Sequence, residues 1–167
     1  MNAMNNLWMH PDNSWIRERC DPSNCEHVDL SRPPCLGSIL ADGMGLGKTL
    51  TTLALIVKTS NQAQDFGTHV SSNLPVRCRA TLVICPVATL TNWENEIKLH
   101  FTNESIPYQI FHGRGRGRIK MEELMSALVV LTTYDIIGTS GNPLHTHQIT
   151  IESLNIEWYR IVLDEAQ

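Results

Sequence analysis

The sequence predicts an α/β protein whose core is a mostly parallel sheet with helices on its faces. From residue 37 onward, short apolar runs alternate with segments of helical periodicity, a pattern typical of parallel strands joined by crossover helices. Residues 80–86 form a continuous apolar run, as expected for a strand covered on both faces. A glycine-rich turn at residues 42–47 lies between an apolar run and a helical pattern, which also favours this fold class.

The first predicted elements surround this glycine-rich turn. Residues 38–41 are a short strand candidate, and the helix that follows begins at Gly47-Lys48-Thr49. The apolar residues of this helix recur at helical spacing and share one face: Leu50, Leu53, Ala54 and Val57. Residues 59–76 are polar, and we expect a mobile linker there.

The later elements repeat this alternation. Pro86 ends the strand at residues 80–86, and we expect Thr89 or Thr91 to cap the next helix. The apolar face of that helix carries Leu90, Trp93 and Ile97. Further strands are predicted at residues 108–112, 128–134 and 158–166, a short helix at 119–127 and a surface loop at 138–155.

Length and composition limit the class of protein. The 167 residues are enough for one domain with its own core. We expect residues 1–36, which lack a clear period, to be an irregular leader, and residues 37–167 to be the folded domain. The net charge of −4 excludes a broad basic surface. The N-terminus does not resemble a secretory signal, and no apolar run approaches the ~20 residues of a membrane span.

Cysteines offer a weak alternative to this picture. Cys20, Cys25 and Cys35, with His27 between them, could suggest a zinc site, but their spacing matches none of the common closely paired patterns. Cys85 ends an apolar run, and we expect it to be a small buried hydrophobic residue.

The glycine-rich turn has the composition of a phosphate-binding loop. Its glycines let the backbone curl so that several N–H groups point inward, and the first helical turn adds unpaired N–H groups. Lys48 would bridge the β- and γ-phosphate oxygens, and the Thr49 hydroxyl would ligate Mg²⁺. Asp42 stands where the general pattern has its first glycine. The alternative is a structural turn with a surface lysine.

A pair of acids follows the last predicted strand. Asp164 ends an apolar run, where it could hold Mg²⁺ through the water shell of the ion. Glu165 would then orient or deprotonate the water that attacks the γ-phosphate. These acids alone are a weak signal, because acids often end strands. In combination with the upstream loop they favour a nucleoside-triphosphate hydrolase.

These motifs resemble those of the Snf-type helicase-like ATPases, the chromatin-remodelling and DNA-translocating branch of helicase superfamily two. The segment "ADGMGLGKTLTTLALI" is similar to the first motif of that family, in which Asp occupies the position of Asp42. The later family blocks are matched in order by "TLVICPVATLTNWENEI", "IFHGRGR", "VVLTTYDII" and "WYRIVLDEAQ". The resemblance covers roughly residues 37–167, and the subgroup looks closest to fungal post-replication repair translocases.

The resemblance implies a RecA-like ATP-binding lobe, partial at its C-terminal side, in a nuclear protein that tracks double-stranded DNA or chromatin. ATP would be bound by Asp42, Gly43, Met44, Gly45, Leu46, Gly47, Lys48 and Thr49, and Mg²⁺ by Thr49 and Asp164. Lys48 and Glu165 would be the catalytic residues. The DNA backbone would face Pro86, Thr89, Thr132 and Thr133. The alternative for Thr132 and Thr133 is that they are ordinary β-branched residues of a strand, without a role in DNA binding.

The family also implies parts that this sequence lacks. The glutamine that reads adenine is absent upstream of the loop. The arginine that stabilises the transferred phosphate would come from a second RecA-like lobe, and such an arginine contributes ~10³–10⁵ in rate. We therefore expect the chain alone to bind nucleotide weakly or not at all, and to hydrolyse it negligibly.

Several interpretations stay open at this point. A degraded fragment or an interaction module without enzymatic activity is one alternative, and a small P-loop kinase is another. The strip "GRGRGR", residues 113–118, places three arginines on a flexible segment that either contacts phosphate or is a solvated loop. Trp93 lies on the apolar face of its helix, so we expect a core residue and not a platform for base stacking.

Overall fold

The protein is described by a computed structural model, which covers residues 37–43, 45–68, 75–101, 105–138 and 149–166. The chain divides into two units, Met1–Ala41 and Asp42–Gln167. In the first unit, residues 37–41 contain neither helix nor strand, so the predicted strand at 38–41 is wrong. The four strands of the described sheet all follow the glycine-rich turn in the sequence.

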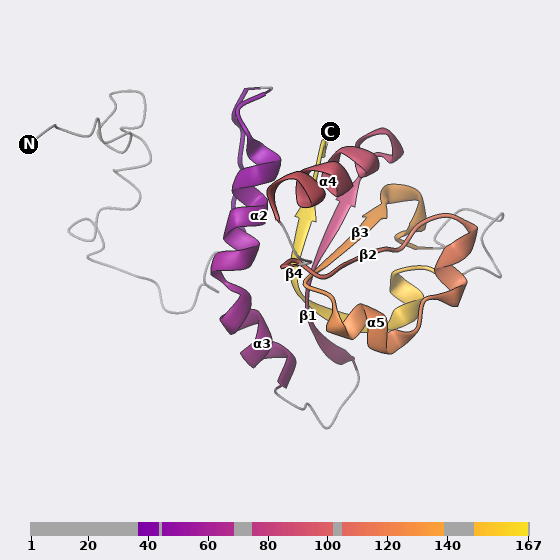
Figure 1. The fold of residues 1–167 in the computed structure, drawn as a ribbon. Coiled ribbons are helices and arrows are strands. Elements are labelled where there is room, and N and C mark those ends of the chain that lie inside the picture. The colour runs from indigo at the N-terminus through magenta and orange to yellow at the C-terminus, as the bar shows by residue number, and fades with distance from the viewer. Residues whose placement is uncertain (1–36, 44, 69–74, 102–104, 139–148, 167) are drawn as a thin grey trace, which may run out of the picture. The chain divides into compact units, whose positions relative to one another are not determined.

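The second unit contains a four-stranded sheet, in which all neighbouring strands run parallel (Figure 1). Its spatial order is β2-β3-β1-β4. The strands are β1 (Val76–Cys85), β2 (Tyr108–Ile110), β3 (Val129–Thr133) and β4 (Ile156–Leu163). The predicted α/β class with a mostly parallel sheet is thus confirmed. Because the strands are parallel, their carboxyl ends meet at one edge of the sheet, where ligands bind in open α/β folds.

Helices lie on both faces of this sheet. Helices α2 (Lys48–Lys58) and α4 (Val87–His100) pack against one face, and α5 (Met121–Ser126) packs against the other. Strand β1 explains the two cores, because successive side chains alternate between faces. Its Val83 and Cys85 join the cluster with α2 and α4, and Leu82 and Ile84 join the cluster with α5. The predicted burial of Cys85 is confirmed, since its side chain is 0% exposed.

Helix α2 buries a narrower stripe than its periodicity predicts. Only Leu53 and Ile56 are buried, whereas Leu50 and Val57 are 38% and 41% exposed. The helix lies at the β4 side of the sheet (Figure 1) and packs on the core through residues three apart. A helix at the margin of a sheet has one narrow contact line, so a wide apolar face is not needed.

Residues 60–68 form a helix and not the expected linker. Helix α3 (Ser60–Thr68) buries Ala63, and the ring of Phe66 lies 5.6 Å from the ring of Tyr159 on β4. The Arg77 guanidinium of β1 lies 5.1 Å from the same Phe66 ring. Two residues three apart are enough to hold this helix on the sheet, although its composition is polar.

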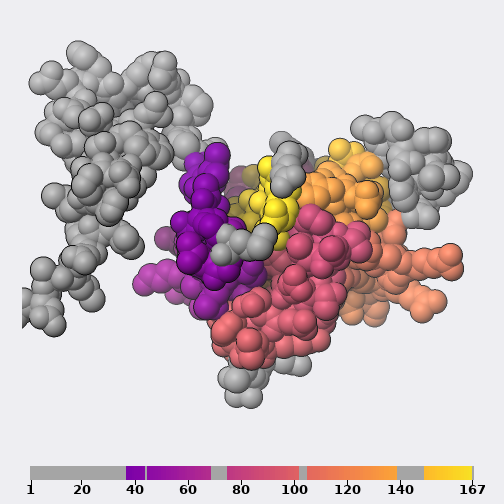
Figure 2. All heavy atoms as spheres, turned by 90° about the horizontal axis from the view of Figure 1, so that it is seen from above, coloured from indigo at the N-terminus to yellow at the C-terminus, as the bar shows by residue number. Residues whose placement is uncertain are grey.

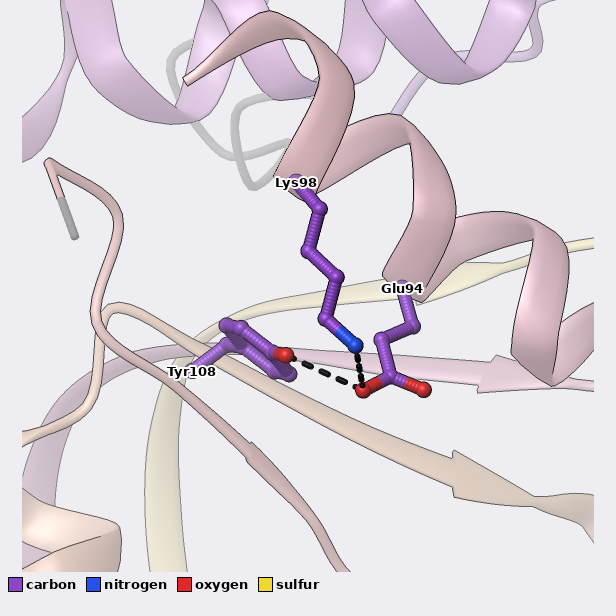
Figure 3. Close-up of polar contacts among 3 residues, drawn as sticks. All are labelled: Glu94, Lys98 and Tyr108. Atoms are coloured by element: carbon purple, nitrogen blue, oxygen red, sulfur yellow. Dashed lines mark hydrogen bonds and ion pairs between the residues drawn. The ribbon is translucent and has the colours of Figure 1, made fainter. Parts of the chain in front are cut away.

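Helix α4 begins directly after Pro86, and no side chain caps it. The expected threonine cap is therefore wrong. Thr89 lies inside the first turn, where its hydroxyl donates to the Pro86 carbonyl at 3.1 Å. Further along, Figure 3 shows the Glu94 carboxylate accepting from Lys98 Nζ at 2.7 Å and from the Tyr108 hydroxyl of β2 at 3.1 Å. This contact joins the outer side of α4 to the edge strand β2.

The arginine strip has a fixed geometry, contrary to expectation. Residues Arg114–Arg118 form a 3-10 helix, η4. The Arg116 side chain is only 7% exposed, and it donates from Nε to the Ile149 carbonyl at 2.8 Å and from Nη1 to the Gly113 carbonyl at 2.5 Å. Arg114 and Arg118 are exposed. Carbonyl acceptors around one arginine thus order a segment that alternating glycine alone would leave flexible.

Two further expectations concern metal and membrane. The cysteine and histidine residues of the weak zinc alternative lie outside the described residues. Within the described ranges, no group of three or more His, Cys, Asp or Glu side chains is placed to hold a metal ion. No helix of the described part has the length and apolar character that a membrane span requires.

Candidate functional site

A cleft of about 540 Å³ lies at the carboxyl edge of the sheet. In Figure 2, which views this edge, the yellow end of β4 lies between the start of α2 and helix α4. The cleft is lined by Gly45, Gly47, Lys48, Thr49, Leu50, Thr89, Asn92, Trp93, Asn95, Glu96, Asp164 and Glu165. The glycine-rich loop and the terminal acids, more than a hundred residues apart in the sequence, therefore face one space.

The loop has the backbone conformation that its glycines permit. Gly45 and Gly47 have φ angles of 81° and 75°, in the left-handed region that side chains disfavour. Gly47 is also the residue that precedes α2, and its carbonyl accepts the first helical bond from Thr51 N at 2.9 Å. Leu46 is 68% exposed and its N–H donates to the Gly43 carbonyl at 3.4 Å. Met44 lies outside the described residues.

Lys48 bends back over the loop. Its Nζ donates to the backbone carbonyls of Asp42 and Gly43 at 2.8 and 3.1 Å. Both acceptors are neutral and exposed. A phosphate oxygen carries a negative charge that attracts the ammonium more strongly than a neutral carbonyl does, so a phosphate in the cleft would compete well for this ammonium. The neighbouring Thr49 lines the same cleft.

Asp164 is held by three elements. Its N–H donates to the Ile84 carbonyl of β1 at 2.9 Å. Its carboxylate Oδ2 accepts from Trp93 Nε1 of α4 at 2.8 Å. Its own carbonyl accepts from the Tyr134 hydroxyl at 2.8 Å, and Tyr134 begins the short 3-10 helix η5 (Tyr134–Ile136) after β3. The position of this carboxylate is therefore fixed from both backbone and side chain.

Glu165 has an unusual backbone conformation. Its φ angle is 51°, in the left-handed region, where an L-residue other than Gly costs roughly 1–2 kcal/mol. Such outliers cluster at functional sites. The exposed Glu165 side chain borders the cleft beside Asp164, where a carboxylate can accept a proton from water.

The residues of the cleft fit a magnesium-nucleotide complex. Mg²⁺ usually takes only one or two carboxylates from a protein and completes its octahedron with phosphate oxygens and waters. Lys48, Thr49 and Asp164 line one cleft, and Asp164 Oδ1 accepts no hydrogen bond from the described residues. The carboxylate oxygen of Asp164 and the hydroxyl of Thr49 can thus ligate Mg²⁺, and the ammonium of Lys48 can bind phosphate oxygens.

The charge of the acids reaches neighbouring groups. Burial raises the pKa of the Tyr134 hydroxyl, and the negative charges of Asp164 and Glu165 raise it further. Tyr134 therefore stays a hydrogen-bond donor at neutral pH. Burial also raises the pKa of the Cys85 thiol, as is usual for a structural cysteine in apolar surroundings.

The residues expected to face DNA are placed differently from one another. Thr89 is half-buried and borders the cleft, next to Pro86. Thr132 is 0% exposed, and its hydroxyl donates to the Phe111 carbonyl at 2.9 Å. Thr133 is 1% exposed, with its hydroxyl 3.1 Å from His112 Nδ1. Both threonine side chains face the interior, so a phosphate reaching them would have to displace these bonds.

Two residues around the acids were not predicted as site residues. Trp93 is a core residue as expected, at 2% exposed, yet its indole N–H reaches Asp164. Tyr134 was noticed only as part of a motif. A sequence signal exists for Trp93, because a buried indole N–H usually finds an acceptor. The identity of that acceptor depends on the fold.

The fold and the cleft together define the class, an α/β domain of the nucleotide-binding type. Comparison with known families then identifies the group: the model of the SNF2-related domain matches residues 7–167, and the chain belongs to this family. The resemblance seen in the sequence motifs is confirmed.

Individual relatives agree with this assignment. The chain is 35% identical over 144 residues to an uncharacterised ATP-dependent helicase of Schizosaccharomyces pombe. It is 33% identical over 147 residues to the DNA repair protein RAD5B of Arabidopsis thaliana and 36% identical over 138 residues to the ATP-dependent helicase rhp16 of S. pombe. Each match covers 78% of this chain but only 13%, 11% and 14% of the respective relative.

A solved structure is also similar. The chain is 26% identical to the SWI2/SNF2 ATPase core of Sulfolobus solfataricus, determined in complex with double-stranded DNA. The match covers 76% of this chain and 27% of that one, with a TM-score of 0.46.

Proposed function

We propose that this chain supplies the ATP-binding part of a motor that couples ATP hydrolysis to tracking along double-stranded DNA or chromatin in the nucleus. Membership of the SNF2-related family supports the binding of a nucleotide. Relatives named ATP-dependent helicases and DNA repair proteins support the DNA partner and a repair-related subgroup. The observation that carries the proposal is the single cleft that brings the glycine-rich loop and the terminal acids together.

Each residue of the cleft has a role in this proposal. The loop residues, Asp42 to Gly47, hold the phosphates with backbone N–H groups. Lys48 leaves the loop carbonyls and binds the β- and γ-phosphate oxygens. Thr49 and Asp164 hold Mg²⁺, which neutralises charge at the phosphates when bound. Glu165 orients a water molecule and accepts its proton.

Hydrolysis by this chain alone is proposed to be slow. No arginine lines the cleft among the described residues, and the arginine that stabilises phosphoryl transfer contributes ~10³–10⁵ in rate. We propose that this residue is provided by a second RecA-like lobe. DNA contact is proposed at the start of α4, at Pro86 and Thr89, where small groups and backbone can meet phosphate. At Thr132 and Thr133, contact would require rearrangement of their hydrogen bonds.

Thermal unfolding with Mg²⁺ and ADP tests the proposal. A ligand at 100 times its dissociation constant stabilises a protein by about 2.7 kcal/mol, which is a shift of several degrees for a domain of this size. We expect the 167-residue chain to be protected, and we expect Lys48→Ala to reduce the protection strongly. A chain that Mg²⁺ and ADP leave unprotected at millimolar concentration contradicts the proposal.

A matched control distinguishes loss of the nucleotide site from the mere loss of one positive charge on α2. Lys58 lies at the other end of α2, in the last turn, and is exposed. Lys58→Ala removes the same side chain from the same helix. It should retain the protection by Mg²⁺ and ADP, because its ammonium is away from the loop. Equal losses in both variants would show that the effect is nonspecific.

A further inference from the structure

Asp164 receives hydrogen bonds from two aromatic side chains on different elements. Trp93 of α4 donates to the carboxylate Oδ2 at 2.8 Å, and Tyr134 donates to the backbone carbonyl at 2.8 Å. The two contacts differ in what they fix. Tyr134 holds the main chain, which the bond from Asp164 N to the Ile84 carbonyl already anchors. Trp93 alone, among the described residues, holds the carboxylate.

The indole is itself rigidly placed. Trp93 is 2% exposed and belongs to the core cluster shared by α2, α4, β1 and β3. The indole N–H can only donate a hydrogen bond, so the carboxylate oxygen must be the acceptor. A hydrogen bond to an ionised acceptor is short and strong. The contact therefore selects one orientation of the Asp164 side chain and occupies one of its two oxygens.

The second oxygen is left for another partner. Oδ1 accepts no hydrogen bond from the described residues, and Asp164 lines the cleft together with Lys48 and Thr49. A carboxylate that was free to rotate would offer its oxygens to a cation only part of the time. Groups that orient a metal ligand from behind typically change metal affinity 10–100-fold when they are removed.

We propose that Trp93 is a positioning residue for the metal-binding acid: its indole N–H holds one oxygen of Asp164 so that the other is presented to the Mg²⁺ of a bound nucleotide. This inference rests on the proposed nucleotide site. It assigns to a core tryptophan a role in metal dependence that packing alone does not give. It also makes the indole N–H a reporter of metal binding, because the acceptor oxygen belongs to the ligand of the ion.

The test measures the Mg²⁺ dependence of ADP binding by the 167-residue chain. ADP affinity is determined calorimetrically in EDTA and at increasing MgCl₂. For Trp93→Phe we expect the MgCl₂ concentration at half effect to rise about 10-fold or more, with ADP affinity in EDTA changed less than about 2-fold. Trp158→Phe is the control, because Trp158 packs in the other core cluster. It should move neither value.

A second measurement leaves the core intact. The indole N–H resonance of Trp93, assigned by its absence in Trp93→Phe, is followed by NMR as MgCl₂ is added to the unaltered chain with ADP. We expect a shift that depends on Mg²⁺ and is lost in Asp164→Ala.

The outcomes are distinguishable. If the unaltered chain does not bind ADP, both the proposed function and this inference are overturned. If it binds ADP with Mg²⁺ enhancement, the function stands. An unchanged Mg²⁺ dependence of ADP binding in folded Trp93→Phe would then overturn only the role proposed for Trp93. An indole resonance that does not shift when Mg²⁺ is added would have the same consequence.

Discussion

Replacing Arg116 by Met should destabilise the protein, because this arginine organises two backbone segments. The side chain is 7% exposed and lies in the 3-10 helix that follows β2. Its bonds to the carbonyls of Gly113 and Ile149 measure 2.5 and 2.8 Å. The first closes the turn before the helix. The second holds the segment that leads into β4.

The magnitude follows from these two bonds. A hydrogen bond from a charged donor contributes about 1.5–3 kcal/mol, and a neutral one about 1. Gly113 is half-buried and Ile149 is exposed, so water can partly satisfy their carbonyls after the substitution. Met retains much of the apolar volume. We therefore expect Arg116→Met to lower the free energy of unfolding by about 2 kcal/mol, which is below the ~3–6 kcal/mol that two fully buried bonds of this kind would contribute.

Urea denaturation followed by circular dichroism measures this change. Arg118→Met is the matched control, since Arg118 lies in the same 3-10 helix and is exposed. Its effect should stay within about 0.5 kcal/mol. Equal effects of the two substitutions would refute the reasoning, because they would mean that the buried contacts of Arg116 contribute nothing beyond an exposed arginine.

Three further predictions follow from the described contacts. The hydrogen bond from Lys98 is the main cause that lowers the pKa of Glu94, so this carboxylate stabilises the fold above its ordinary pKa of about 4.3. That stability is lost as the pH falls through the lowered value, and Glu94→Gln should flatten this acid limb in urea midpoints measured from pH 6 to 3. Glu165→Gly should preserve stability or raise it by up to ~1 kcal/mol, because Gly tolerates positive φ; a clear loss in thermal unfolding would contradict the strained conformation. Ile161 is 56% exposed on β4, an edge strand of the described sheet, so we predict that the protein self-associates through this edge on heating and that Ile161→Lys slows the rise in light scattering; equal rates in the two proteins would contradict this.

Much of the sheet was predictable because its signal is local. Continuous apolar runs gave the positions of β1 and β3 within a few residues, since strands buried on both faces have no polar alternation. The sequence motifs predicted that Thr49 and Asp164 would share one Mg²⁺, and in the structure both residues line one cleft. The confirmed burial of Trp93 and Cys85 also follows from pattern alone.

The failures share a physical cause, which is dependence on distant partners. Helix α3 forms because Phe66 meets Tyr159 of β4, a contact that the polar composition of residues 60–68 does not reveal. Arg116 is ordered by the Ile149 carbonyl, which lies far along the chain. The same holds for the bond between Trp93 and Asp164. In each case, one side of the interaction is visible in the local sequence and the other depends on the tertiary fold.

The central claim is that Lys48 and Asp164 act in one nucleotide site. The most direct measurement is a double-mutant cycle on the affinity for ADP in the presence of Mg²⁺, with Lys48→Ala, Asp164→Ala and the combined variant. Residues that share a bound partner give coupling energies of about 0.5–3 kcal/mol. We predict a coupling in this range, with both single substitutions weakening binding. Losses that add within about 0.3–0.5 kcal/mol, or a single substitution without effect, would contradict a shared site.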